Sequence, residues 1–260
     1  MSKPFTFLKL CIFQFVTFLP GRVLRVMEAA SQSAQGKGWV RGVEEEIRAI
    51  QHLAKNAGIR RPVVLDVGAN VGSWTSSLKK IMPESEVHAF EPSSVAFACL
   101  QKLQGALIDV HIYPLGLGKE AKRATLYFDE PASTKASLIR RRLDHIDIIL
   151  SSTEDVQITT LDAWQAEFNI FAPNVLKLDV EGNEFDVLQG GENLLKSIKV
   201  VQFEFGGSNI DSRVFFQDFW YFFLERGFYI LRLTPRGLRK VTRYDEIEET
   251  FRFTIFYAVR

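Results

Sequence analysis

Short apolar runs alternate with amphipathic segments through the middle of the chain. Short segments in which apolar residues dominate predict buried strands, and apolar residues at intervals of three and four predict helices packed against them. The predicted strands are Val63–Val67, Val87–Phe90, Val110–Tyr113, Val175–Gly182 and Lys199–Phe205. The predicted helices are Ser73–Ile81, Ser93–Leu103, one that runs through Leu195, and a Phe-rich one at 212–226. Such alternation predicts parallel strands joined by right-handed crossovers.

Two stretches depart from this rhythm. Between Gly116 and Thr160, the segments "ATLYF" and "VQITT" alternate apolar and polar residues as strands do, and they flank a long polar loop. At the end of the chain, "FYILRLT" and "FRFTIFYAV" also alternate, with a basic turn between them. We therefore expect a β-rich insertion in the middle of an α/β domain and a closing pair of strands.

The first sixty residues form a separate part of the pattern. A helix is predicted from Val43, and Gly58 is placed to end it. The polar stretch Ser31–Gly38 predicts a linker or loop. These features divide the chain into an N-terminal helical extension, residues 1–60, and a second domain, residues 61–260.

Within residues 4–25, the run from Phe5 to Leu19 is dense in Phe and Leu and is followed by Arg22 and Arg25. Lys9 and Gln14 interrupt the run, which is too short for a comfortable membrane span of about 20 apolar residues. The residues after it are bulky and basic, unlike a signal-peptide cleavage site. Two interpretations remain open: a helix in the interface of a membrane, as a peripheral contact, or a helix packed against the domain or a partner.

Composition narrows the classes of function. In the 260 residues, the hydrophobic fraction is 47%, which is typical of a globular chain. The formal net charge is +1, so the overall charge does not indicate a protein that binds nucleic acid. The two cysteines, Cys11 and Cys99, form no disulfide framework or metal motif, which favours a reducing, cytoplasmic compartment.

Acidic residues follow the predicted parallel strands. In open sheets of this kind, ligands bind beyond the carboxyl ends of the strands. One acid there is usually a helix cap or a solvated loop end, but several at one edge indicate a binding site. The acids in question are Asp66, Glu91, Asp179, Glu181 and Glu204.

Gly68 and Gly72 indicate how a ligand reaches this edge, because glycine permits tight turns and a close backbone approach. The pattern G-A-N-V-G lacks the G-x-G-x-x-G of dinucleotide sites, and Asp66 so close to the turn would repel a pyrophosphate. Glu91, at the end of the next strand, is placed to accept hydrogen bonds from a ribose diol. A nucleoside that carries a positive charge meets these demands, which describes S-adenosylmethionine.

Four segments in this order resemble the FkbM family of S-adenosylmethionine-dependent methyltransferases. They are "VLDVGANVGSWT", "VHAFEPSSVAFACLQ", "ITTLDAW" and "VLKLDVEGNEFDVLQGGENLL". The resemblance implies a class I methyltransferase fold, a Rossmann-like doubly wound sheet of about seven strands with the last strand antiparallel. It also implies that Asp66, Gly68, Asn70 and Gly72 lie against the methionine part of the cofactor and Glu91 against its ribose. The family's acceptors are hydroxyls of sugars, lipopolysaccharide or polyketide-type metabolites, and the residues before Arg60 have no counterpart.

Methyl transfer to a hydroxyl requires a group that accepts the proton. Asp179 is the first candidate and Glu181 the second. Lys177 lies within a strand that is expected to be buried, where an unpaired charge is costly, so Asp179 or Glu204 is its expected partner. The alternative is a structural ion-pair network. Carboxylates of this set could also bind magnesium, but we expect no metal.

The insertion supplies further candidates for the acceptor site. The segment "STKASL", which contains Ser137, resembles a Ser-containing piece that the family places near the site. Two interpretations stay open for it: part of the substrate pocket, or an ordinary exposed loop. His145 is a weaker candidate base. Arg140, Arg141 and Arg142 fit either an anionic acceptor or, more simply, a solvated helix face. Glu204 completes the substrate-binding set. The expected function is O-methylation of a sugar, glycolipid or secondary metabolite; the alternatives are a nicotinamide-dependent oxidoreductase and a non-catalytic membrane-associated module.

Overall fold

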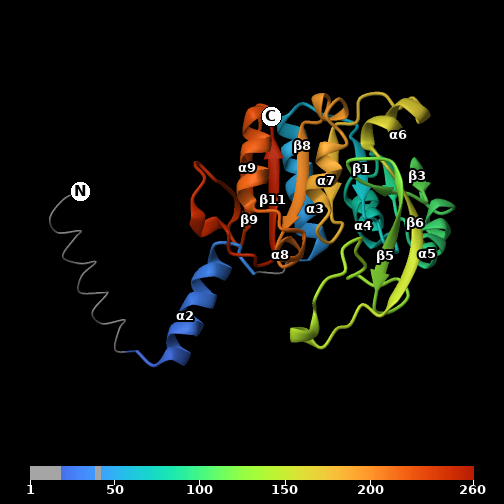
Figure 1. Cartoon of the computed structure of the whole chain (residues 1–260). Helices are drawn as coiled ribbons and strands as arrows, with labels where there is room; N and C mark the ends of the chain where they lie inside the picture. The colour runs from blue at the N-terminus through green and yellow to red at the C-terminus, as the bar shows by residue number, and fades with distance from the viewer. Residues whose placement is uncertain (1–18, 39–41) are drawn as a thin grey trace.

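An eight-stranded sheet forms the centre of the computed structural model, which describes residues 19–38 and 42–260 (Figure 1). The spatial order is β10-β9-β11-β8-β7-β1-β2-β3. The strands are β1 (Val63–Val67), β2 (Glu86–Phe90), β3 (Val110–Tyr113), β7 (Val175–Leu178), β8 (Val200–Phe205), β9 (Tyr229–Thr234), β10 (Gly237–Lys240) and β11 (Thr254–Val259). From β3 to β8 all neighbours are parallel, and β11 is antiparallel to both β8 and β9. The mostly parallel sheet with an antiparallel last strand is confirmed, with β10 as an eighth strand.

Helices cover both faces of the sheet. One face packs against α3 (Val43–Asn56), α4 (Ser73–Ile81) and α5 (Ser94–Gln104) through a core that includes Ile50, Leu78 and Leu100. The other face packs against α6 (Leu161–Phe168), α7 (Glu184–Gln189) and α9 (Phe216–Glu225). The remaining helical elements are α2 (Gly21–Ala34), α8 (Ser208–Ser212), η1 (Asp144–Ile146), η2 (Leu194–Lys196) and η3 (Glu246–Glu248). Because both faces are covered, the central strands are mostly apolar, which is why they can be recognised in the sequence.

The predicted β-rich insertion is present as a small second sheet. It is formed by β4 (Gly116–Leu117), β5 (Lys122–Phe128) and β6 (Ser152–Thr159), in the order β4-β6-β5. The chain between β5 and β6 is a long loop that turns back on β5, where Tyr127 and Ser137 pair through their backbones. This pairing brings the "STKASL" segment to the edge of the main sheet.

The N-terminal part differs from the sequence-based expectation in one respect. The stretch Ser31–Gly38 was expected to be a linker or loop, but only residues 35–38 form a turn, because α2 continues to Ala34. Serine and glutamine cost a helix only a few tenths of a kcal/mol each, so the polar residues do not stop it, and the helix ends just before Gly36. The helix α3 packs directly on the sheet, with Ile47 and Ile50 fully buried.

Candidate functional site

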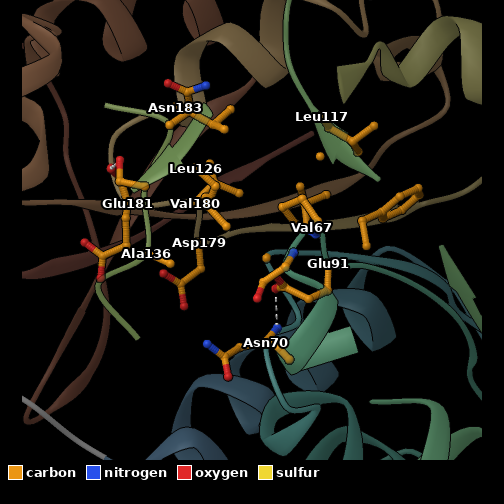
Figure 2. A pocket seen from close by; sticks show the side chains of 18 of the residues that line it. Val67, Asn70, Glu91, Leu117, Leu126, Ala136, Asp179, Val180, Glu181 and Asn183 are labelled. Carbon is orange, nitrogen blue, oxygen red and sulfur yellow. Dashed lines mark hydrogen bonds between the residues drawn. The ribbon is translucent and has the colours of Figure 1, made fainter. Parts of the chain in front are cut away.

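The loops after β1, β2 and β7 line one hollow at the carboxyl edge of the sheet (Figure 2). These three strands are parallel neighbours in the sheet, so their ends meet there. Gly68 and Asn70 come from the first loop, Glu91 from the second, and Asp179 and Glu181 from the third. The insertion closes the hollow from outside, through residues 133–138.

Glu91 is the buried carboxyl group of this hollow. Its Oε2 accepts the Asn70 N–H at 2.8 Å (Figure 2). Its Oε1 accepts the Ser93 N–H, also at 2.8 Å, so two backbone amides fix the group in place. Burial raises the pKa of Glu91 to about 7, although the hydrogen bonds from the two backbone amides lower it. Each oxygen keeps a further lone pair, so the carboxyl group can accept hydrogen bonds from a ligand.

The two glycines of the turn have different roles. Gly68 has φ +79°, and a Cβ there would lie 1.9 Å from the Asp179 carbonyl oxygen, so its glycine allows the loops after β1 and β7 to touch. Gly72 has φ +83°, and a Cβ there would lie 2.4 Å from a methyl group of Leu103 on α5. Gly72 does not line the hollow. It serves helix packing, whereas Gly68 serves the site.

Asp66 lies beneath the turn, outside the hollow. It is fully buried, accepts the Thr75 hydroxyl at 2.6 Å and lies 2.9 Å from the Lys177 Nζ. Lys177 also donates to the Gly68 carbonyl at 3.0 Å. The expected partners of Lys177 were Asp179 or Glu204; Asp179 is more distant, at 3.7 Å, and no ion pair to Glu204 is present among the described residues. The sheet register explains the difference, because Lys177 sits directly opposite Asp66 on the neighbouring strand.

Lys177 keeps its proton in this setting. Burial alone lowers the pKa of a lysine, but the charges of Asp66 and Asp179 outweigh it and raise the pKa above its usual value. An ammonium group that is committed to Asp66 and the Gly68 carbonyl holds the glycine turn in position. Lys177 thus supports the turn from beneath and does not line the hollow.

Asp179 is the carboxylate that the hollow leaves accessible. Its side chain is 48% exposed and points into the hollow beside Glu91 (Figure 2). Its backbone N–H donates to the Val67 carbonyl at 3.2 Å, which continues the β1–β7 ladder by one residue. The rigid sheet therefore places this carboxylate, while its oxygens remain available.

Glu181 holds the insertion against the sheet. It has a positive φ of 51°, and its two carboxylate oxygens contact Lys135, at 3.0 Å, and Arg141. Its carbonyl accepts the Ser137 hydroxyl at 2.8 Å. Both oxygens are committed to cations of the insertion, so Glu181 is less suited to accept a proton than Asp179 is.

Arg141 corrects an expectation for the insertion. The three arginines do not lie on a helix face, because residues 140–143 have no helical structure. Arg140 and Arg142 are exposed, but the Arg141 side chain is 7% exposed and contacts Glu181 and Asp211. The sequence could not show this, because the partners lie far along the chain and the loop has no periodicity.

Two candidate substrate residues, Glu204 and His145, do not line the hollow. Glu204, on β8, is partly buried, and burial together with the charges of Asp179, Glu181 and Glu184 raises its pKa well above the usual value. His145 is exposed in η1. Neither is among the residues that line the hollow, whereas Ser137 is.

Of two further residues that join these loops, Glu184 was missed in the sequence, whereas Asn70 was expected against the cofactor. The buried carboxylate of Glu184 accepts the N–H groups of Val180 and Gly182, and it thereby shapes the loop that carries Asp179 and Glu181. In the sequence, the available signal for Glu184 was its position two residues after Gly182, in the segment "DVEGNE". Asn70 donates to the Ala132 and Ser133 carbonyls, so the glycine turn also holds the insertion.

The described residues contain no group of three or more His, Cys, Asp and Glu side chains that could hold a metal ion. The described helices include none that is long and apolar enough to cross a membrane. The expected membrane contact at residues 4–25 falls largely on residues 1–18, which lie outside the described part of the chain.

Curated relatives share part of the chain. A 2-O-methyltransferase, NoeI, of Sinorhizobium fredii is 23% identical over 57% of this chain and 65% of its own length. A hexuronic acid methyltransferase, AglP, of Haloferax volcanii is 28% identical over 62% of each chain. Methyltransferase 1 of Beauveria bassiana is 29% identical over 49% of this chain and 57% of its own length. The chain thus matches less than two thirds of the length of each relative.

The family assignment rests on a longer match. The model of the methyltransferase FkbM domain matches residues 66–230, which is more than half of the chain and includes every strand end that lines the hollow. The chain belongs to the FkbM methyltransferase family.

Proposed function

We propose that this protein is an S-adenosylmethionine-dependent O-methyltransferase that acts on a hydroxyl of a sugar, a glycolipid such as lipopolysaccharide, or a secondary metabolite. The observation that carries the proposal is the juxtaposition of Glu91, the Gly68 turn and the accessible Asp179 in one hollow at the carboxyl edge of the sheet. Family membership and the relatives' names support it.

The residues of the hollow fit the cofactor. Glu91 presents two fixed carboxyl oxygens, which suit a ribose diol, and the glycine at position 68 lets backbone approach the ligand closely. Leu115, Leu117 and Leu126 give the hollow an apolar wall that suits a base. No acid follows β3, so adenine would be recognised by backbone groups and this wall. When bound, S-adenosylmethionine supplies an activated methyl group on a sulfonium.

Asp179 is the proposed proton acceptor. An acceptor hydroxyl within about 3 Å of the methyl carbon must lose its proton as the new C–O bond forms. The Asp179 carboxylate lies in the hollow with its oxygens accessible, whereas Glu181 is committed to the insertion and Asp66 is buried. Lys177 and Glu184 hold the two loops that place this carboxylate.

The proposal is tested by isothermal titration with S-adenosylhomocysteine. We expect the intact protein to bind it and Glu91→Gln to bind at least about tenfold more weakly, since a carboxylate accepts charge-assisted hydrogen bonds that an amide does not. Glu84→Gln, an exposed site just before β2, is the matched control and should bind as the wild type does. An absence of binding to the intact protein would contradict the proposal.

A further inference from the structure

The helix α2 has an apolar face that the described residues leave exposed. Val23, Met27, Ala30 and Ala34 recur at helical intervals and so share one side of the helix. None of the residues of α2 is buried; Val23 is 37%, Met27 49% and the neighbouring Val26 69% exposed. An exposed apolar face on an isolated helix indicates a surface that is covered in use.

The position of α2 is fixed by the turn that follows it, at residues 35–38. Lys37 is 3% exposed; its Nζ donates to the Ile247 carbonyl at 2.8 Å and lies 3.0 Å from Glu248. The Gly38 N–H donates to the Phe253 carbonyl at 2.8 Å. At Gly36, a Cβ would lie 2.0 Å from the Leu233 carbonyl oxygen, so the turn is in close contact with β9. The helix therefore projects from an anchored base.

The anchor lies at the same edge of the sheet as the hollow. Leu233 is the second-last residue of β9, which runs parallel to β8 because both are antiparallel to β11. Phe253 precedes Thr254, which pairs with the last residue of β8. Both contacts are at the carboxyl edge, where Glu91 and Asp179 also lie. Figure 1 shows α2 leaving the molecule on the same side as the loop that follows β5.

Charge identifies what covers the apolar face. The sequence up to Met27 carries Lys3, Lys9, Arg22 and Arg25 and no acid, and its first acidic residue is Glu28. Residues 5–19 are rich in Phe and Leu. An amphipathic helix with basic residues, continuous with an apolar and aromatic segment, fits the interface of an anionic bilayer. A second copy of the chain would bring these like charges together, which disfavours it.

We propose that α2 docks the protein on an anionic phospholipid surface with the carboxyl edge of the sheet turned toward the bilayer. The hollow then opens toward acceptors that are held in the membrane, which selects the glycolipid among the proposed acceptors. The docking itself stands apart from the proposed function, whereas the choice of acceptor rests on it.

Vesicle co-sedimentation of the full chain tests the docking. We expect binding to phosphatidylcholine vesicles with about 30% phosphatidylglycerol, weakened by salt and by omission of the anionic lipid. The double variant Val23→Glu/Met27→Glu should bind at least about tenfold more weakly, because two apolar side chains no longer enter the interface. The matched control Ala29→Glu/Gln32→Glu adds the same charge on the opposite side of the helix and should retain most of the binding.

The orientation is tested by hydrogen exchange with and without vesicles. Protection is expected in α2 and in the loop after β5, and none is expected at residues 83–85, at the opposite edge of the sheet. Four results would each overturn the proposal. The wild-type protein could stay in the supernatant, or the two double variants could lose vesicle binding equally. The protein could form a dimer that the Val23→Glu/Met27→Glu variant abolishes, or residues 83–85 could become protected. Titration with S-adenosylhomocysteine should be unchanged in both variants, so a failure of docking and a failure of the proposed function are distinguishable.

Discussion

The buried pair of Lys177 and Asp66 links the centre of the sheet to the glycine turn. Lys177 reaches the Gly68 carbonyl on one side and Asp66 on the other, and Thr75 binds the second oxygen of Asp66. The sequence correctly marks Lys177 as a buried cation that needs a partner. It cannot choose the partner, because alternation along one strand does not reveal which residue lies opposite on the next. The register of β1 and β7 makes that choice.

Removing one member of this pair should be costly. Lys177→Met leaves Asp66 as an uncompensated buried charge, and we expect a loss of about 3–5 kcal/mol in the free energy of unfolding. The double variant Asp66→Asn/Lys177→Met should recover much of that loss, because the charge is removed as well. Denaturant unfolding monitored by circular dichroism measures both. A loss below about 1 kcal/mol in Lys177→Met would show that the pair does not carry the predicted coupling.

At the scale of elements, the insertion and the strand ends are joined by ion pairs and by neutral hydrogen bonds. Glu181 binds Lys135 and Arg141, and Asn70 binds the carbonyls of Ala132 and Ser133. The strands and helices of the main sheet were predictable because burial imposes periodicity on them. These contacts were not, because they join residues of an irregular loop to residues far away in the chain.

Glu181 should therefore affect the insertion more than the chemistry. In Glu181→Ala, the loop at residues 129–142 loses its contacts with the carboxylate, and we expect about tenfold faster amide exchange there, with methyl transfer reduced as a consequence. Asp179→Asn is the matched comparison: methyl transfer should fall while exchange in the loop stays unchanged. Hydrogen exchange by mass spectrometry measures the first effect. Unaltered amide exchange in Glu181→Ala would show that the contacts of Glu181 do not hold this loop in place.

Across the whole molecule, the strand ends that form the site were predictable from the sequence. The burial of the acidic side chains, and therefore their pKa values, was not. Glu91 and Asp179 follow apolar runs, and parallel strands bring their carboxyl ends to one edge, so the sequence suffices to group them. The degree of burial depends on helices and loops from elsewhere in the chain. Glu46, Glu91 and Glu184 lie on α3, after β2 and on α7, and burial raises the pKa of each to about 7.

These raised pKa values make the folded protein less stable as pH increases. Between the unfolded pKa of 4.5 and the folded pKa of about 7, the folded state holds a proton that the unfolded state has released. Unfolding then releases protons, so stability falls as pH rises and the fall levels off above the folded pKa. From pH 6 to pH 8 we expect a loss of about 1 kcal/mol for a group such as Glu184, or about 2–4 °C in melting temperature. His88, whose pKa burial lowers to about 4, acts in the opposite direction mainly below pH 6.5.

Glu184→Gln isolates one of these groups. Glutamine keeps an oxygen that can accept the Val180 and Gly182 N–H groups but has no proton to release, so the fall in melting temperature between pH 6 and pH 8 should shrink by about that amount. Glu225→Gln, an exposed site on α9, should leave the profile unchanged. Differential scanning calorimetry across the pH range measures both variants beside the wild type. A profile that is as steep in Glu184→Gln as in the wild type would mean that Glu184 is ionised in the folded protein. The loop after β7 would then enclose a buried negative charge that the Val180 and Gly182 N–H groups compensate.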